Sequence, residues 1–304
     1  MTNEPSKFWQ NLAKEHRTDL DQFGLPLMKR HQALRYFTWR WNWSAAARSA
    51  QLRFLLRRTT PRDWLAAWRN PELSDDAWAS TEWSRLERRL YTFSVRLLWM
   101  YAERHGIGQA LTLREPDLGG PLPVYWGGRL ISQDLANTSL ELRCMQPALA
   151  RGPRSILEVG AGYGRTAYAL LSLFPSATYT IVDIEPAVDI SRWYLTELFG
   201  AERLRFLGPD EAASIPDASI DLAISISSLH EMTPPTVSTY LHLIDQVAAD
   251  GHVYLKQWTS WHNVDDLMTS TMADYPFPDR WRQLHWAPAP VQTEFTEGLW
   301  AVPH

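Results

Sequence analysis

Three glycines at alternate positions, Gly160, Gly162 and Gly164, lie between a short apolar run and a helix-like run in the stretch ILEVGAGYGRTAYALL. A strand, a glycine turn and a helix in this order can cradle a nucleotide-like ligand. Glycine lets the backbone approach the ligand closely, and the first helical turn offers free N–H groups. Glycine turns also exist only to connect a strand tightly to a helix, so a ligand site and a purely structural turn both stay open.

Two acids accompany this turn. Glu158 precedes it, and Asp183 ends a second strand-like run, TYTIVD, at the distance where an acid is expected to meet a pair of ribose hydroxyls. The dinucleotide fingerprint G-x-G-x-x-G requires its third glycine where this chain has Arg165. The spacing therefore disfavours a NAD(P)-dependent oxidoreductase, which is kept as an alternative.

A histidine–acid pair, His230–Glu231, follows the apolar run IDLAISISSL. Histidine suits proton removal because its ordinary pKa is near neutrality. We expect His230 to act as a general base, with Glu231 as its orienting partner or as a contact to a substrate hydroxyl. A structural or helix-capping histidine beside a first-turn helix acid is the alternative.

The chain around these residues shows two different patterns of apolar residues. Residues 1–115 carry apolar side chains at three- and four-residue spacing, which predicts a helical domain. Residues 116–150 combine a Gly/Pro-rich linker with one further helix over 131–150. Residues 151–304 alternate short apolar runs with helical stretches, which predicts an α/β fold with a mostly parallel sheet between helices. The predicted strands are 155–159, 178–183, 204–207, 220–226 and 251–257, followed by a closing pair in RWRQLHWAP and VQTEFTEGLWAV.

Composition limits the function classes. The 304 residues are 45% hydrophobic and 21% charged, as in ordinary globular proteins. The single cysteine excludes an internal disulfide and a Cys-rich structural zinc site, and it fits a reducing compartment. No apolar run approaches the roughly 18 residues of a membrane span, and no secretory signal is evident. We therefore expect a cytoplasmic protein without a membrane partner.

Charge and aromatic residues are unevenly distributed. Residues 1–115 hold 19 Lys/Arg against 12 Asp/Glu, a balance of +7, whereas residues 116–304 hold 11 against 22, a balance of −11. The arginines are spread through helical patterns, so we expect no nucleic-acid partner. Trp39, Trp41 and Trp43 could cover a ligand, although core packing is the more frequent role of tryptophan. The aromatic helices also suggest a homodimer.

The segments LEVGAGYG and YTIVDIE resemble motifs I and II of class I S-adenosylmethionine-dependent methyltransferases. The resemblance implies S-adenosylmethionine as cofactor and S-adenosylhomocysteine as product, and a Rossmann-like class I methyltransferase sheet. It implies that the glycine turn holds the methionine part, that Asp183 binds the ribose, and that Asp210 touches the adenine. The predicted cofactor contacts are Glu158, Gly160, Gly162, Tyr163, Gly164, Asp183, Ile184, Asp210 and Ser225.

Further segments are similar to the sugar O-methyltransferase family of actinobacterial antibiotic pathways. They are YTIVDIEPAVDISRWYLTELFG, SIDLAISISSLHEM, YLKQWTSWHNVDD, YPFPDRW and VQTEFTEGLW, and they span nearly all of residues 150–304. This similarity implies methylation of a hydroxyl on a small molecule, a sugar or a glycosylated natural product. Plant small-molecule O-methyltransferases place a general-base histidine in a similar His–acid pair, which supports the same role for His230.

The remaining expectations concern the acceptor side. We expect His262 and Trp258 to contact the acceptor, and the helical N-terminal domain to close over the site. Asp265 and Asp266 follow Asn263 in a pattern that fits a helix N-cap and first turn better than Mg²⁺ ligands, so no metal is expected. N- or C-methylation, a nucleic-acid methyltransferase and a non-catalytic S-adenosylmethionine-binding protein are the alternatives.

Overall fold

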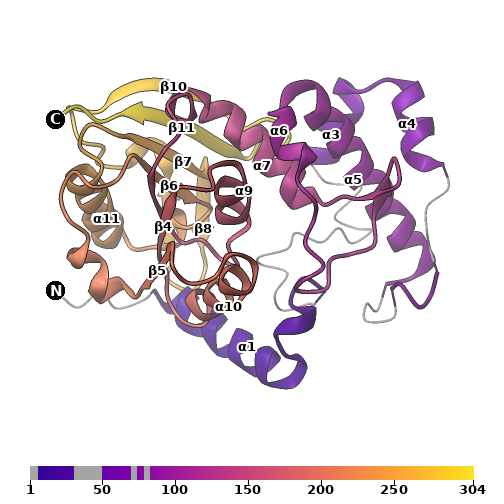
Figure 1. The fold of residues 1–304 in the computed structure, drawn as a ribbon, viewed down its shortest axis with the longest axis horizontal. Coiled ribbons are helices and arrows are strands. Elements are labelled where there is room, and N and C mark those ends of the chain that lie inside the picture. The colour runs from indigo at the N-terminus through magenta and orange to yellow at the C-terminus, as the bar shows by residue number, and fades with distance from the viewer. Residues whose placement is uncertain (1–5, 31–49, 70–73, 79–82) are drawn as a thin grey trace. The chain divides into compact units, whose positions relative to one another are not determined.

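The structure is a computed structural model that describes residues 6–30, 50–69, 74–78 and 83–304 (Figure 1). The chain forms two compact units, which are described separately. Unit 1 comprises Met1–Glu15, Cys144–Ala289 and Glu294–His304, and unit 2 comprises His16–Arg143 and Pro290–Thr293. Residues 6–15 thus group with the α/β part of the chain. Trp39, Trp41 and Trp43 lie outside the described residues.

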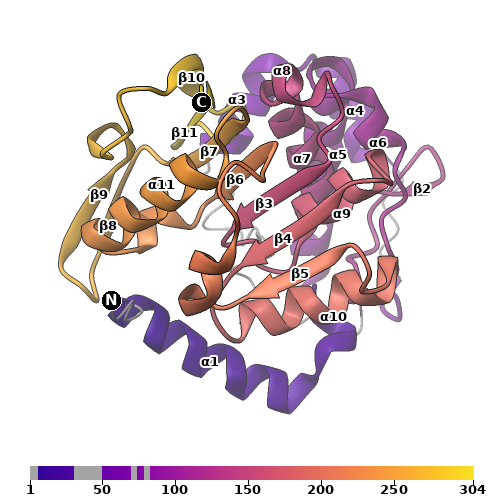
Figure 2. The ribbon, with the colours of Figure 1, turned by 60° about the vertical axis from the view of Figure 1, so that its left-hand side comes forward.

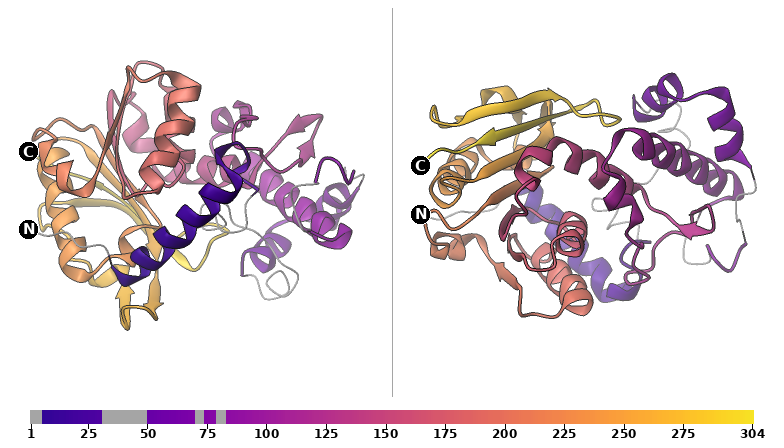
Figure 3. Two further views of the ribbon diagram at one scale, coloured as in Figure 1. Left: turned by 90° about the horizontal axis from the view of Figure 1, so that it is seen from below. Right: turned by 45° about the horizontal axis from the view of Figure 1, so that its top comes forward.

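A seven-stranded sheet in the order β10-β11-β7-β6-β3-β4-β5 organises unit 1 (Figure 2). The neighbouring strands β5, β4, β3, β6 and β7 are parallel. The strands β11 and β10, yellow in the right-hand view of Figure 3, close the sheet in antiparallel pairing. This arrangement confirms the predicted fold class. The strands are β3 (Ser155–Val159), β4 (Thr178–Val182), β5 (Leu204–Leu207), β6 (Leu222–Ile226), β7 (His252–Trp258), β10 (Arg282–Pro288) and β11 (Phe295–Ala301).

Helices cover both faces of this sheet (Figure 1). The helices α9 (Arg165–Leu173) and α10 (Ala187–Phe199) follow β3 and β4, and α11 (Pro234–Val247) follows β6. Leu157 and Val159 of β3 belong to a buried core that includes Tyr240 and Leu241 of α11. Since successive strand residues point to opposite faces, Glu158 points away from this core. The shorter elements are η3 (Pro209–Ser214), η4 (Leu229–Glu231), β8 (Ser260–Asn263), β9 (Met268–Thr271) and η5 (Met272–Asp274).

The order of strands locates a ligand site. Reading along the sheet, the chain runs from β3 to β4 and β5 on one side, and from β6 to β7 on the other. Side chains and turns after β3 and β6 therefore meet at the point where the strand order reverses. In open α/β sheets, ligands bind at this point, beyond the carboxyl ends of the strands.

The single helix predicted over residues 131–150 is two helices. The first, α7, spans Gln133–Cys144, and the second, α8, spans Gln146–Leu149. Pro147 lies in the first turn of α8. Proline lacks the N–H needed to continue the hydrogen bonding of α7 but is tolerated in the first turn of a helix, so α8 begins here as a separate helix.

Unit 2 is largely helical, in agreement with the spacing of its apolar residues. Its long helix α5 contributes Val95, Leu98 and Trp99 to the buried interior, and Trp78 is also fully buried. Core packing thus explains these two tryptophans. Helix α1 spans Lys7–Phe23, and its part from His16 onward belongs to this unit. The further elements are η1 (Leu25–Leu27), α3 (Ala50–Arg58), α4 (Pro61–Trp68), α5 (Arg85–His105), α6 (Gly108–Thr112), β1 (Tyr125–Trp126), β2 (Arg129–Leu130) and α7. Within the described ranges, no helix has the length and apolar character needed to span a membrane.

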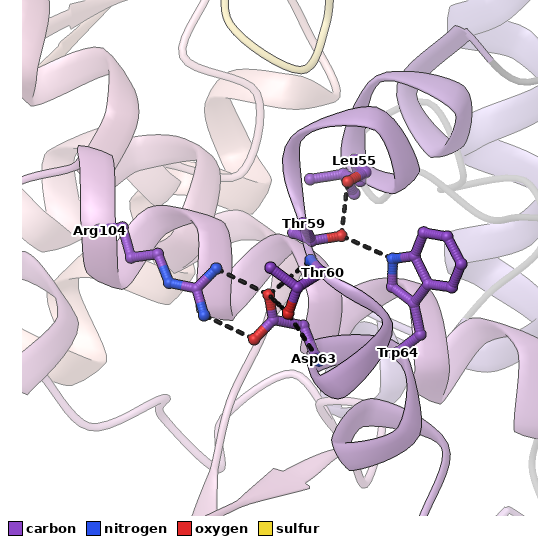
Figure 4. A network of polar contacts seen from close by, with 6 residues as sticks. All are labelled: Leu55, Thr59, Thr60, Asp63, Trp64 and Arg104. Atoms are coloured by element: carbon purple, nitrogen blue, oxygen red, sulfur yellow. Dashed lines mark hydrogen bonds and ion pairs between the residues drawn. The ribbon is translucent and has the colours of Figure 1, made fainter.

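A polar network joins α4 to α5 (Figure 4). Thr60 and Asp63 form a capping box at the start of α4. Arg104 of α5 donates two hydrogen bonds to the Asp63 carboxylate, at 2.6 Å to Oδ1 and 2.9 Å to Oδ2. This guanidinium holds the pKa of Asp63 well below its usual range. Beside it, the Trp64 indole N–H donates to Thr59 Oγ1 at 3.0 Å.

Candidate active site

A cavity of about 50 Å³ lies beyond the carboxyl ends of the parallel strands in unit 1. Its wall combines the turns after β3, β4 and β6 with the start of α11, the loop after β5 and the beginning of α1. Three predicted cofactor residues, Gly160, Asp183 and Ile184, belong to this wall. The lining residues are Ser6, Trp9, Val159, Gly160, Val182, Asp183, Ile184, Pro209, Ser228, Met232, Thr233, Thr236 and Tyr240.

The glycine turn has a left-handed backbone. Gly160 and Gly164 have φ angles of +77° and +92°, which residues with a Cβ rarely adopt. Space is also limiting at both positions. A Cβ on Gly160 would lie 2.0 Å from Ser228 Oγ, and a Cβ on Gly164 would lie 2.8 Å from Leu195 Cδ1. The turn therefore requires glycine even without a ligand, because the loop after β6 and helix α10 pack directly against it.

Asp183 connects the ends of β3 and β4. Its Oδ2 accepts the Gly162 N–H at 3.0 Å, and its Oδ1 accepts the Ile184 N–H at 2.8 Å. Burial raises the pKa of Asp183 to about 7, although these N–H groups and that of Ala161 favour the charged form. The carboxyl group is thus held at the cavity wall and changes charge near neutral pH.

Tyr240 of α11 lines the cavity and was not predicted as a site residue. Burial is the main cause that raises the pKa of its phenol, and the charges of Asp183 and Asp210 raise it further. Tyr240 therefore carries its proton at neutral pH and can donate a hydrogen bond. The helical pattern of α11 marks Tyr240 only as an apolar-face residue, so the sequence offers no local signal for a role in the site.

The other predicted cofactor residues do not line the cavity. Glu158 is buried and its Oε2 accepts the Tyr179 O–H at 2.7 Å. The Tyr163 ring packs edge-to-face on Tyr194, with centroids 5.3 Å apart. Asp210 is exposed on η3, and its neighbour Pro209 lines the cavity instead.

Gln257, which the sequence did not single out, organises the loop that carries His230. It is completely buried on β7. Its Nε2 donates to the Ser225 carbonyl at 3.1 Å, and its Oε1 accepts the Ser228 N–H at 3.0 Å and faces His230 Nδ1 at 3.1 Å. Since Oε1 can only accept, His230 Nδ1 must carry the proton, and the lone pair of the neutral ring is on Nε2. The predicted contact Ser225 is therefore a fully buried support for this loop.

The pair His230–Glu231 is buried, with His230 Nε2 lying 3.4 Å from Glu231 Oε1. Burial lowers the pKa of His230 to about 4, against the opposing effect of Gln257. Burial raises the pKa of Glu231 well above its ordinary value, and the Trp9 indole offsets this only in part. The ordinary near-neutral pKa of histidine therefore does not apply to His230 in this conformation, because the ring is desolvated. Burial therefore favours the uncharged form of both groups, and neither group lines the cavity.

The beginning of α1 lies at this cavity, although no individual residue of this segment was predicted as a site residue. Ser6 and Trp9 line the cavity. The Asp266 carboxylate accepts the N–H groups of Lys7 at 3.0 Å and Phe8 at 3.2 Å, and Ser6 Oγ accepts the Trp9 N–H at 3.3 Å. These bonds satisfy three of the N–H groups that a helix start leaves without partners.

Aromatic rings continue this contact toward the loop after β6. The Phe8 ring meets Trp261 edge-to-face at 5.2 Å, and Trp261 meets His230 edge-to-face at 5.1 Å. The predicted acceptor contact Trp258 lies 6.5 Å from the His230 ring and 4.8 Å from Phe295. Trp261, next to the predicted His262, is thus the aromatic residue in closer contact with His230.

His262 and the neighbouring acids form a hairpin. His262 is exposed on β8 and its Nδ1 lies 3.0 Å from Thr269 Oγ1 on β9. Asn263 Oδ1 accepts the N–H groups of Asp265 and Asp266, at 3.0 and 3.2 Å. The predicted helix start at these residues is wrong: Asn263 caps a turn between two strands, and Asp266 caps α1 instead.

Comparison with known proteins gives the class of this unit. Residues 157–253 match the family described as a methyltransferase domain. The chain carries a methyltransferase domain. The match runs from β3 into β7 and so contains the glycine turn, Asp183 and the His230–Glu231 pair. Together with the strand order, it identifies a class I methyltransferase that uses S-adenosylmethionine and releases S-adenosylhomocysteine. No curated protein matches the sequence.

Several solved structures are similar to part of the chain at low identity. A methyltransferase from Aquifex aeolicus is 15% identical over 49% of this chain and 82% of that chain, with a TM-score of 0.39. The 1,6-didemethyltoxoflavin N1-methyltransferase of Burkholderia thailandensis, solved with S-adenosylhomocysteine, is 20% identical over 53% and 79%, with a TM-score of 0.41. The cyclase SpnF is 16% identical over 59% and 86%, with a TM-score of 0.46.

Proposed function

We propose that this methyltransferase acts on a hydroxyl of a small molecule, a sugar or a glycosylated natural product. The acceptor oxygen would form a bond to the methyl carbon while the carbon–sulfur bond of the sulfonium breaks, and the hydroxyl proton would pass to the enzyme. The observation that carries the proposal is the meeting of the glycine turn, Asp183 and the loop of His230 at one switch point. The choice of a sugar hydroxyl rests on the sequence similarity to sugar O-methyltransferases.

The residues present fit S-adenosylmethionine, which supplies a methyl group already activated by its positive sulfur. Asp183 offers two carboxylate oxygens at the cavity wall, suited to a pair of ribose hydroxyls. Gly160 exposes backbone to the cavity, and Ile184 and Pro209 offer apolar surface beside it. We assign the methionine part to the turn 160–164, the ribose to Asp183, and the adenine to the surface formed by Ile184 and Pro209.

His230 is proposed as the base that takes the hydroxyl proton. Its ring is neutral at pH 7, and the proton on Nδ1 leaves the lone pair on Nε2. Because neither His230 nor Glu231 lines the cavity, this role requires a rearrangement that opens Nε2 to the acceptor. Hydration would then raise the pKa of His230 toward its ordinary value, which makes it a stronger base only when the site is open.

Two experiments separate the parts of this proposal. Calorimetric titration with S-adenosylmethionine should give one site, and Asp183→Ala should weaken binding without unfolding the protein. Mass spectrometry of reactions with a panel of sugar and glycoside acceptors should show a gain of one methyl group on oxygen. His230→Gln should lower kcat and leave cofactor affinity within about twofold. Methylation on nitrogen or carbon, or full turnover by His230→Gln, would overturn the hydroxyl and base assignments respectively.

A further inference from the structure

A cysteine, a histidine and a glutamate meet in unit 1 outside the candidate active site. Cys144 ends α7, His285 lies on β10 and Glu297 lies on β11. One ligand atom from each, the cysteine sulfur, an imidazole nitrogen and a carboxylate oxygen, lies within 4.8 Å of the other two. None of the three lines the cavity that holds Gly160 and Asp183. The cluster is therefore a separate candidate site.

The alternation of the edge strands explains this meeting. Trp286 of β10 and Trp300 of β11 pack with the core cluster beneath α11. His285 and Glu297 are an odd number of residues away from these tryptophans, so their side chains point to the opposite face of the sheet. Cys144 joins them there from the end of α7. Two consecutive strands and the end of a helix distant in sequence thus place different ligand types at one point.

One ring nitrogen of the histidine has no hydrogen-bond partner among the described residues. His285 Nε2 is buried and makes no hydrogen bond within the described part of the chain. It lies 3.7 Å from Glu297 Oε1. Two ligands of one tetrahedral zinc ion, with bonds of about 2.0 Å, lie roughly 3.3 Å apart, so a small side-chain adjustment suffices.

The carboxylate is oriented by a second residue. The Tyr254 O–H on β7 donates to Glu297 Oε2 at 2.8 Å, and Tyr254 is fully buried. This bond holds Oε2, while Oε1 lies 3.7 Å from His285 Nε2. Outer hydrogen bonds of this kind orient metal ligands in known zinc sites.

We propose that Cys144, His285 and Glu297 bind one zinc ion. Sulfur, nitrogen and oxygen in one set suit zinc, whereas Mg²⁺ and Ca²⁺ require oxygen ligands. Binding would release the thiol proton of Cys144, so that the thiolate, the imidazole Nε2 and the carboxylate occupy three positions and water the fourth. The ion would fasten Cys144 to the β10–β11 edge of the sheet, and it takes no part in methyl transfer.

Cobalt provides a direct test, because the chain has a single cysteine. Purified full-length protein is freed of metal with a chelator and titrated with Co²⁺. A thiolate-to-cobalt charge-transfer band can then arise only from Cys144. We expect this band at one equivalent, its loss on addition of Zn²⁺, and its absence in Cys144→Ser. If wild-type protein gives no such band, the proposal is wrong.

Calorimetry with ZnCl₂ alone gives a second readout. Cys144→Ser and Glu297→Gln should each weaken zinc binding by more than tenfold, and Tyr254→Phe by roughly 10- to 100-fold. The matched control is His242→Gln, which removes an exposed histidine of α11 and should leave zinc affinity unchanged. Equal zinc affinity in Cys144→Ser and wild type would overturn the assignment. Catalytic activity is not used as a readout, so failure here leaves the proposed methyltransferase function standing.

Discussion

The cap at the start of α1 allows a quantitative prediction about closure of the active site. Asp266 is the side-chain acceptor for the N–H groups of Lys7 and Phe8. Asp266→Ala removes both bonds, and loss of a helix N-cap acceptor costs about 1–2 kcal/mol. Trp9 lies in the same turn and lines the cavity. The equilibrium constant for opening of this segment should therefore rise roughly 5- to 30-fold.

Hydrogen exchange followed by mass spectrometry measures this opening on a peptide that covers residues 6–12. Cofactor binding should respond as well. The cavity of about 50 Å³ is far smaller than the roughly 300 Å³ of a small-ligand site, so S-adenosylmethionine must enter an opened form. Where opening limits entry, the association rate in stopped-flow experiments should rise by the same factor.

The neighbouring acid provides the control. Asp265 contributes its backbone N–H to the same turn, but its side chain makes no hydrogen bond shown for the described residues. Asp265→Ala should leave exchange over residues 6–12 unchanged, and Asp266→Asn, which keeps one acceptor oxygen, should give an intermediate rate. Equal exchange in Asp266→Ala and Asp265→Ala would refute the view that this cap holds the segment over the cavity.

Three further predictions concern buried polar groups. Gln257→Leu leaves buried donors unpaired, at a cost of about 1–3 kcal/mol each, and should lower the melting temperature. Gln257→Glu places a carboxylate beside His230 and should raise the pKa of His230 above about 4 in an NMR titration. Asp183→Asn removes a charged acceptor and should weaken S-adenosylmethionine binding in calorimetry by roughly 10- to 100-fold, since hydrogen bonds to charged groups contribute about 1.5–3 kcal/mol. The affinity of the wild type for S-adenosylmethionine should fall as the pH drops below about 7, where Asp183 takes up a proton. Asp63→Asn should destabilise unit 2 by about 1 kcal/mol at pH 7. Arg104 lowers the folded-state pKa of Asp63, so the stabilising effect of the Asp63 carboxylate is complete above the unfolded pKa of about 3.9 and is lost as the pH falls toward the folded value. The melting temperatures of Asp63→Asn and wild type should therefore converge in acid.

The sheet could be predicted from the sequence because its signals are local. Each parallel strand is a short apolar run, and each is bounded by a turn or a helical pattern within about ten residues. The strands β3 and β5 lie at the predicted residues, and the others differ only at their ends. The break at Pro147 was missed because a proline in the first turn of a short helix resembles one near the end of a long helix.

The site could be predicted only in part, because its remaining contacts join distant segments. Nothing in the sequence near Trp9 indicates that α1 begins at the cavity, since its cap, Asp266, is 258 and 259 residues away from the two N–H groups that it accepts. The sequence gives no signal for Gln257 either. In YLKQWTSW it is one polar residue within a strand, and its role depends on the position of His230 across β6 and β7. Burial, which sets the protonation of His230 and Glu231, is likewise a property of the assembled fold.

The glycine at position 160 shows how one residue can give two signals that the sequence does not separate. Its pattern predicted close approach of a ligand to the backbone, and Gly160 does line the cavity. The space that a side chain there would need is nevertheless filled by Ser228, whose Oγ would lie 2.0 Å from the added Cβ. Ser228 belongs to the loop that Gln257 holds and that continues into His230. A glycine at 160 therefore lets the proposed cofactor turn and the loop of the proposed base pack against each other, so a substitution there is expected to disturb both together.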